Sequence, residues 1–208
     1  MPVIEYYYSA HSAYAYIGSV KLFEICATHE CTLRHFPITL SPVVEASGSL
    51  PFAKRSEGHD AYYFGREIER WADFRNAPIA GFRPTHHDNS LDLSNGMLIA
   101  AIQQGADVDR LSHRILEAHW RDDIDLANPD DLARTAHSVG IDPTPLLEAA
   151  LSDEVQAIHA QNTQSAIEQN VFGSPTYILD GDMYYGQDHL ELLERALITP
   201  YPEPYYTQ

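Results

Sequence analysis

The chain opens with apolar residues in two different arrangements. Residues 2–8 (PVIEYYY) are rich in β-branched and aromatic side chains, which predicts a β-strand. Residues 13–29 form an apolar stretch with a helical pattern. Residues 32–38 (TLRHFPI) again favour a strand, which ends near Pro37. A strand, a helix and a strand in succession need a right-handed crossover, so the helix should begin at the carboxyl edge of the sheet.

The middle of the chain has helical patterns separated by loops. Residues 57–74 are helical in pattern, whereas the segments 43–55 and 76–90 contain Gly, Ser and Pro and are expected to be loops. Asn128 before Pro129 and two aspartates is typical of a helix start. The further helices that the pattern predicts span residues 91–104, 108–120, 129–139, 144–151 and 152–170.

The last part of the chain returns to strands. Pro175 opens an apolar strand at residues 176–179 instead of interrupting one. A second short strand, residues 183–185, follows an Asp-Gly-Asp sequence that indicates a hairpin turn. A helix over residues 187–197 completes the pattern, and the Pro- and Tyr-rich residues 199–208 are expected to be an extended tail.

The order of these elements predicts the fold class. Strand, helix, strand, a long helical stretch, then strand, strand and helix indicate an α/β fold: a thioredoxin-like sheet interrupted by an all-α insertion domain. Residues 1–40 and 171–198 would form the thioredoxin-like domain, residues 41–170 the helical insertion domain, and residues 199–208 the C-terminal tail. In thioredoxin-like proteins, the proline that opens this strand is cis and lies against the active site, so we expect a cis bond before Pro175.

Composition and charge narrow the class of partner. The chain has 208 residues, 44% hydrophobic and 11% aromatic, as in folded globular proteins. Its formal net charge of −17 argues against binding to nucleic acid or to an anionic membrane surface. No basic segment precedes the first strand, and no apolar run is long enough to span a membrane. We therefore expect a soluble cytoplasmic protein.

The cysteines argue against disulfide exchange. Redox thioredoxins carry a Cys-x-x-Cys pair where the first strand meets the first helix, but this chain has Ser9-Ala10-His11-Ser12 there. Its two cysteines, Cys26 and Cys31, lie beyond that junction and suggest a reducing compartment. Without a thiol pair at the junction, a disulfide oxidoreductase is a poor interpretation.

Three short motifs carry a family resemblance: SAYAYIG at residues 12–18, VFGSPT at 171–176 and YYGQD at 184–188. With these motifs in this order, nearly the whole chain resembles the 2-hydroxychromene-2-carboxylate isomerases and the related kappa-class glutathione transferases. The resemblance implies glutathione as cofactor, a small aromatic molecule as substrate, and a homodimer. It implies an isomerase of aromatic-compound degradation that works by addition and elimination of the glutathione thiol on an unsaturated aryl-pyruvate.

Two other functions stay open beside this one. A kappa-type transferase would conjugate small electrophiles and consume glutathione. A non-catalytic module would bind glutathione or a peptide without forming either product.

Ser12 is the candidate catalytic residue. A serine before a helix commonly serves only as its N-cap. A hydroxyl there can also donate a hydrogen bond to a thiolate, which the positive end of the helix favours. Ser9 is the alternative, but the family pattern places Ser12 in register with Tyr14, Tyr16 and Gly18. Ala13 departs from the proline usual in the family after this serine, and the hydroxyl is retained.

The resemblance also implies the residues that hold glutathione. The backbone of Ser174, before Pro175, would pair with its cysteinyl part as in β-augmentation. Amides at the start of the last helix would hold the γ-glutamyl carboxylate, and Asp188 its ammonium group; helix capping is the alternative role for Gln187 and Asp188. The implied site comprises Ser12, Ser174, Pro175, Tyr185, Gly186, Gln187 and Asp188.

The substrate-binding residues are less well defined. Asn89 and Ser90 keep the family pattern, but Leu91-Asp92 stands where basic residues are expected. Lys54, Arg55 and Arg83 are candidates to hold a substrate anion, the alternative being that each is a solvated surface charge. The predicted substrate-binding set is Lys54, Arg83 and Asn89.

The remaining polar and aromatic clusters have ordinary explanations. His86-His87-Asp88 lacks the spacing of a zinc signature, so we expect a solvated loop and no metal site. Whether His11, next to Ser12, contacts the substrate stays open. The tyrosines near the first junction, Tyr6, Tyr7, Tyr8, Tyr14 and Tyr16, are expected in the core and in the wall of the site.

Overall fold

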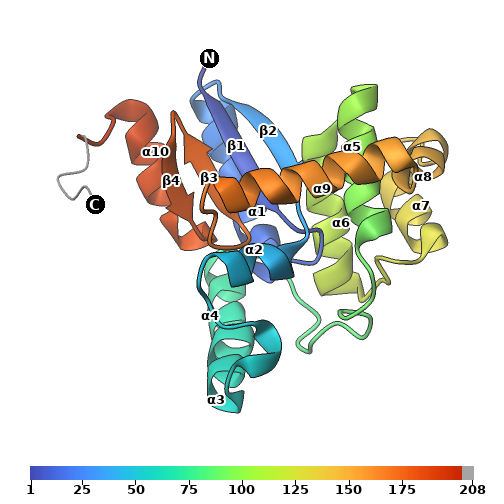
Figure 1. Ribbon diagram of the computed structural model, residues 1–208, viewed down its shortest axis with the longest axis horizontal. Helices are drawn as coiled ribbons and strands as arrows, with labels where there is room; N and C mark the ends of the chain where they lie inside the picture. Colours follow the sequence, from blue (N-terminus) through green and yellow to red (C-terminus); the bar gives the residue numbers. More distant parts are fainter. Residues whose placement is uncertain (203–208) are drawn as a thin grey trace.

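The N-terminal strand lies inside a four-stranded sheet in the computed structural model, which describes residues 1–202 (Figure 1). β1 (Val3–Tyr8) pairs in parallel with β2 (Thr32–Pro37) and antiparallel with β3 (Thr176–Leu179). β3 forms a hairpin with β4 (Asp182–Tyr185), so the strand order is β2-β1-β3-β4. The predicted strands and the predicted α/β class with a helical insertion are confirmed.

Alternate side chains of the strands enter two different apolar clusters. Tyr6 and Tyr8 face α1 (Ala13–Thr28), and their rings stack with centroids 4.1 Å apart. Tyr7 and Ile178 face the other way, toward α9 (Asp153–Glu168), which crosses the opposite face of the sheet (Figure 1). Successive side chains of a strand point to opposite faces, and both faces of this sheet are covered. Every tyrosine in β1 is therefore buried.

The other helices form two groups and one separate helix (Figure 1). One group gathers beside β2, a second one projects beyond the carboxyl edge of the sheet, and a last helix covers the β4 side. In chain order they are α2 (Leu40–Ala46), α3 (Glu57–Asp60), α4 (Glu67–Phe74), α5 (Asp92–Gln104), α6 (Val108–Asp122), α7 (Pro129–Ser138), α8 (Thr144–Ala150) and α10 (Leu190–Ile198); shorter turns are 3-10 helices at Phe52–Lys54 and Gln187–His189 and a π-helix at Ala61–Arg66.

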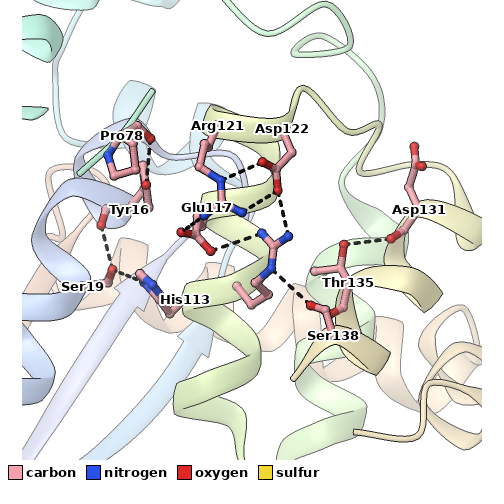
Figure 2. Close-up of polar contacts among 11 residues, drawn as sticks. Tyr16, Ser19, Pro78, His113, Glu117, Arg121, Asp122, Asp131, Thr135 and Ser138 are labelled. Carbon is pink, nitrogen blue, oxygen red and sulfur yellow. Dashed lines mark hydrogen bonds and ion pairs between the residues drawn. The ribbon is translucent and has the colours of Figure 1, made fainter. Parts of the chain in front are cut away.

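Polar contacts attach α1 to the loop after α4 and to α6 (Figure 2). The Tyr16 hydroxyl donates to the carbonyl of Pro78 over 2.8 Å. Ser19 lies one turn further along α1, and its hydroxyl is 2.8 Å from Nδ1 of His113 on α6. The insertion shares the main apolar core with the sheet, since Tyr6 and Leu116 belong to one cluster. The domain boundaries at residues 40 and 171 stay a prediction.

The structure corrects the expected elements in two places. Residues 43–55 are not one loop, because Val43 and Val44 are buried in α2, Val43 packs in the apolar cluster on one face of the sheet, and residues 52–54 form a 3-10 turn. The last helix starts with the 3-10 turn at residues 187–189 instead of as one α-helix. In the predicted tail, residues 199–202 are neither helix nor strand, and residues 203–208 lie outside the described residues.

None of the helices within residues 1–202 has the length and apolar character that a membrane crossing needs.

Gly18 determines how closely α1 approaches the turn at residues 187–189. A Cβ atom at this position would lie 2.6 Å from Cβ of Gln187 and 3.2 Å from Cδ1 of Leu190. We therefore expect Gly18→Ala to lower the free energy of unfolding by about 1–3 kcal/mol, the usual cost of overpacking. Chemical denaturation of Gly18→Ala measures this loss.

Gly58→Ala is the matched control. Gly58 lies in α3, and its added Cβ would meet no atom within 4 Å. Alanine is a better helix former than glycine, so this variant should be as stable as the wild type or more stable by up to about 1 kcal/mol. Equal stability of the Gly18 variant and the wild type would show that the turn moves away freely.

Candidate active site

The junction between β1 and α1 lies against the segment that opens β3. Ser12 is the N-cap of α1, and its Oγ accepts a hydrogen bond from the backbone N–H of Ala15 over 3.2 Å. The same hydroxyl donates to the carbonyl oxygen of Ser174 over 3.1 Å. The peptide bond between Ser174 and Pro175 is cis, as the sequence predicts. The structure thus brings together the two motifs on which the predicted site depends.

Ser174 contacts the β1–α1 junction through both its hydroxyl and its carbonyl oxygen. Its Oγ accepts from the backbone N–H of Ser9 over 3.1 Å, and its carbonyl accepts from Ser12. Within residues 1–202, the N–H of Ser174 makes no hydrogen bond. Pro175 accepts at its carbonyl from the N–H of Gly186 over 2.9 Å, so residues 185–188 lie beside Ser174. The backbone donor at this strand edge is therefore the N–H of Ser174, and the backbone acceptor is its carbonyl oxygen, to which Ser12 donates.

The turn after β4 is tight and depends on Gly186. Its φ of +96° is unfavourable for other residues, and a Cβ there would lie 2.3 Å from Oδ1 of Asp188. Gln187 is 1% exposed, and its Oε1 accepts from Nε of Arg75 over 3.1 Å. Nε2 of Gln187 is buried and lacks a hydrogen-bond partner within residues 1–202. Arg75 also binds Glu191, so α4 is attached to the start of α10.

Two cavities meet at Ser174 and Tyr185. The smaller one measures about 240 Å³ and includes Tyr14, Trp71 and Asp188 in its wall. The larger one measures about 930 Å³ and extends from Ser12 along α2, the α3 region and the loop before α5. Such a pair of connected hollows has room for a peptide-like ligand in one part and a second small molecule in the other.

The predicted glutathione residues lie at or just behind this junction. Tyr185, Gly186 and Asp188 line the smaller cavity, together with Ser174. Ser12 lines the larger one, and Gln187 supports the turn from behind. Ser9 is fully buried, and its hydroxyl is 3.0 Å from Nδ1 of His11.

The predicted substrate-binding residues are placed unequally. Arg83 and Asn89 line the larger cavity, but Arg83 forms an ion pair with Asp88 and Asn89 donates to Asp125. Lys54 is exposed and outside the cavity wall. Its neighbour Arg55 is in the wall. The Arg55 guanidinium lies over the rings of Phe52 and Phe64, 4.5 and 5.5 Å from their centroids.

Residues 86–88 form a loop in which His86 and Asp88 are exposed, as expected, but His87 is not a solvated side chain. Its ring is half-buried, and its Nδ1 lies 2.9 Å from Nε2 of His119 on α6. It packs against Trp120 and against His11, whose ring centroid is 4.8 Å away. Within residues 1–202 no group of three or more His, Cys, Asp or Glu is arranged to hold a metal ion.

Burial changes the protonation of these histidines. Desolvation, with the neighbouring His87 and His119, lowers the pKa of His11 to about 3. Desolvation, with His119 and Arg83, lowers the pKa of His87 to about 4. Both rings are therefore neutral near pH 7 and face the cavity that begins at Ser12.

Sequence patterns did not reveal several residues that hold the site together. The buried amide of Asn95 accepts from the N–H of Ala10 over 3.1 Å, which fixes the loop before Ser12. Nε1 of Trp120 donates to the carbonyl of His11 over 2.9 Å. Both lie on helices of the insertion, and no local sequence signal links them to a junction about 85–110 residues away.

The arrangement favours an anion near Ser12. The N–H groups in the first turn of α1 have no partners within the helix and carry the positive end of its dipole. The Ser12 hydroxyl adds a donor at the same place. The chain itself provides no reactive thiolate there, because Cys26 and Cys31 lie outside the junction. Both are free, and burial raises the pKa of the Cys26 thiol to about 12.

Comparisons with known proteins agree with this architecture. A 2-hydroxychromene-2-carboxylate isomerase from Pseudomonas sp. (strain C18) is 26% identical over 197 residues, covering 94% of this chain and 90% of the relative. Glutathione S-transferase kappa 1 from Rattus norvegicus is 22% identical over 206 residues, covering 94% and 90%. The solved structure of a 2-hydroxychromene-2-carboxylate isomerase superposes with a TM-score of 0.80 at 23% identity, covering 94% of each chain.

A family model describes the chain almost from end to end. The model for the DsbA-like thioredoxin domain matches residues 3–198, which include every strand of the sheet and the whole helical insertion. The thioredoxin-like sheet with its insertion is thus confirmed, and the chain belongs to the family of DsbA-like thioredoxin domains.

Proposed function

We propose that this protein is a glutathione-dependent isomerase of the 2-hydroxychromene-2-carboxylate type. The observation that carries the proposal is the Ser12 hydroxyl at the start of α1, 3.1 Å from the carbonyl of Ser174, where a redox thioredoxin would have a cysteine. The two relatives described above, named as an isomerase and as a glutathione transferase, support it. The proposal includes that the protein is a cytoplasmic homodimer and that it takes part in the degradation of an aromatic compound.

The free polar groups around the smaller cavity fit glutathione. Ser174 offers a backbone N–H without a partner within residues 1–202, beside a carbonyl that can accept. Gln187 and Asp188 begin a helical turn, so their N–H groups have no partners within it and suit a carboxylate. The carboxylate of Asp188 suits an ammonium group. Nε2 of Gln187 is a further buried donor in the same turn.

Glutathione would supply a nucleophilic thiol whose reversible addition to an unsaturated aryl-pyruvate allows rotation about the former double bond. The task of Ser12 is to donate a hydrogen bond from its hydroxyl to the thiolate sulfur. In the structure this hydroxyl donates to the carbonyl of Ser174, so a change of acceptor to the sulfur leaves the Ser174 carbonyl available for a peptide N–H. The positive end of α1 also favours the thiolate.

The larger cavity suits an aromatic anion. Its wall includes Val44, Phe52, Phe64 and Ile68, which provide apolar contacts for a ring. Arg55 has no carboxylate partner within residues 1–202, whereas Arg83 is paired with Asp88. We therefore assign the substrate carboxylate to Arg55 first, with Arg83 and Asn89 as further wall residues, and leave Lys54 at the surface.

The kappa-type transferase is the second candidate, supported by the rat relative. The two functions differ in the fate of glutathione, which an isomerase returns unchanged and a transferase consumes. An assay of free thiol during turnover, with an aryl-pyruvate and then with a small electrophile, distinguishes them. Calorimetric binding of glutathione with turnover of neither compound would instead indicate a binding module.

Ser12→Ala should lower the isomerisation rate and move the rate optimum to higher pH. The variant loses the donor to the sulfur, so the pKa of the bound thiol rises and less thiolate is present at neutral pH. Some activity should survive because the positive end of α1 remains. The pH–rate profile measures the shift, and a thermal melt reports the loss of the N-cap, about 1 kcal/mol.

Ser9→Ala is the control for Ser12→Ala. Ser9 is buried beside the same junction but does not contact Ser174 through its hydroxyl. Its rate and pH profile should stay much closer to those of the wild type. A larger effect at Ser9, or a wild-type profile for Ser12→Ala, would leave Ser12 as a cap only.

Asp188→Asn should weaken glutathione binding by about 1–3 kcal/mol, the usual value of a hydrogen bond to a charged group. The charge is lost while the shape of the side chain is kept. Asp180→Asn is the matched control, since Asp180 is exposed in the β3–β4 turn and lines neither cavity. Titration calorimetry with glutathione should separate the two variants; equal affinities would remove Asp188 from the site.

Arg55→Gln should raise the KM for a carboxylate substrate about tenfold or more, because a charged hydrogen-bond donor is lost from the cavity wall. Lys54→Gln removes the same charge from the adjacent, exposed position and should change KM little. Steady-state kinetics at saturating glutathione makes the comparison. If Lys54→Gln has the larger effect, the sequence-based choice of Lys54 was the better one.

A further inference from the structure

A chain of hydrogen bonds determines the tautomers of two histidines beside the larger cavity. Nδ1 of His119 lies 3.1 Å from the carbonyl oxygen of Ile124. A carbonyl can only accept, so Nδ1 of His119 carries the proton, and in the neutral ring Nε2 is an acceptor. That Nε2 lies 2.9 Å from Nδ1 of His87. Nδ1 of His87 must then carry a proton as well.

The remaining nitrogen of His87 is consequently a lone-pair acceptor. Within residues 1–202 no hydrogen bond involves Nε2 of His87, and the residue lines the larger cavity with Ser12 and His11. The rings of His87 and His119 are within 20° of coplanar, which suits an in-plane hydrogen bond. His11 faces the same space, but its Nδ1 is bonded to a hydroxyl that can donate or accept, so its tautomer is open.

The charged groups around the pair favour movement of a proton away from the cavity. The Arg83 guanidinium lies near His87 and disfavours a positive charge there, whereas the Asp88 carboxylate favours it. At His119, the carbonyl of Ile124 and the carboxylates of Asp123 and Asp125 raise the pKa that burial lowers. A proton taken up at Nε2 of His87 can therefore be balanced by transfer of the Nδ1 proton to His119.

We propose that His87 accepts and returns the proton of the substrate hydroxyl, with His119 as the positioning residue that holds its tautomer; this inference rests on the proposed function. A 2-hydroxychromene-2-carboxylate is a cyclic hemiketal. Its opening breaks the bond between C2 and the ring oxygen, while the 2-hydroxyl loses its proton and becomes a carbonyl. The proton goes to Nε2 of His87 and returns to the phenolate oxygen, so no oxidant or further reactant is needed.

The test compares His87→Gln with His86→Gln, two adjacent histidines of which only His87 lines the cavity. His87→Gln should lower kcat for the cyclic substrate about 100-fold, within the usual range for a general acid–base. The ultraviolet absorbance of bound glutathione thiolate should stay as in the wild type, because Ser12 is intact. His86→Gln should match the wild type in both measurements.

Nitrogen NMR of the full-length protein provides a readout independent of turnover. The chemical shifts of His87 at neutral pH should show a protonated Nδ1 and an unprotonated Nε2, and those of His119 the same. A protonated Nε2 at His87, or a His87→Gln variant as active as the wild type, overturns the inference alone. A wild type that binds glutathione but opens no hydroxychromene overturns the proposed function and the inference with it.

Discussion

The hydrogen bond from the Ser12 hydroxyl to the Ser174 carbonyl joins two segments that are 162 residues apart, and the rest of the site is arranged around it. The β1–β3 pairing brings the two segments to the same edge of the sheet. The absence of a side chain at Gly18 lets the turn at residues 187–189 reach α1. Arg75 then attaches that turn to α4, beyond the sheet. The contact between a helix start and a strand edge thus depends on the packing of five elements: β1, β3, α1, α4 and the turn at residues 187–189.

Much of this geometry was available from the sequence because its signals are local. Strand composition in β1, the proline that opens β3 and the glycine before Gln187 each specify backbone conformation over a few residues. The right-handed crossover rule then places the start of α1 at the correct edge of the sheet. For these reasons the sequence placed Ser12 beside Pro175, and the family resemblance added Ser174 and Asp188 to the same region.

The parts that sequence could not provide depend on tertiary contacts. α2 forms in a Gly- and Pro-containing segment because Val43 covers an apolar face of the sheet. His87 lies in a loop, and its ring is half-buried only because it packs against Trp120 and His119. The choice between Lys54 and Arg55 needed the positions of two phenylalanine rings. In each case the side-chain type alone is compatible with a surface position, and the contacts that decide its place form only in the folded protein.

The charge of the protein limits how an anion can be held. With 30 acidic and 13 basic residues, the molecule as a whole repels anions, so attraction has to come from groups at short range. Several arginines near the site are already neutralised, as Arg75 is by Glu191 and Arg83 by Asp88. Helix N-termini and backbone N–H groups carry no formal charge that a carboxylate could cancel. In the proposed function, the start of α1, the turn at residues 187–188 and Arg55 would therefore be the groups that hold an anionic peptide and an anionic substrate on an acidic protein.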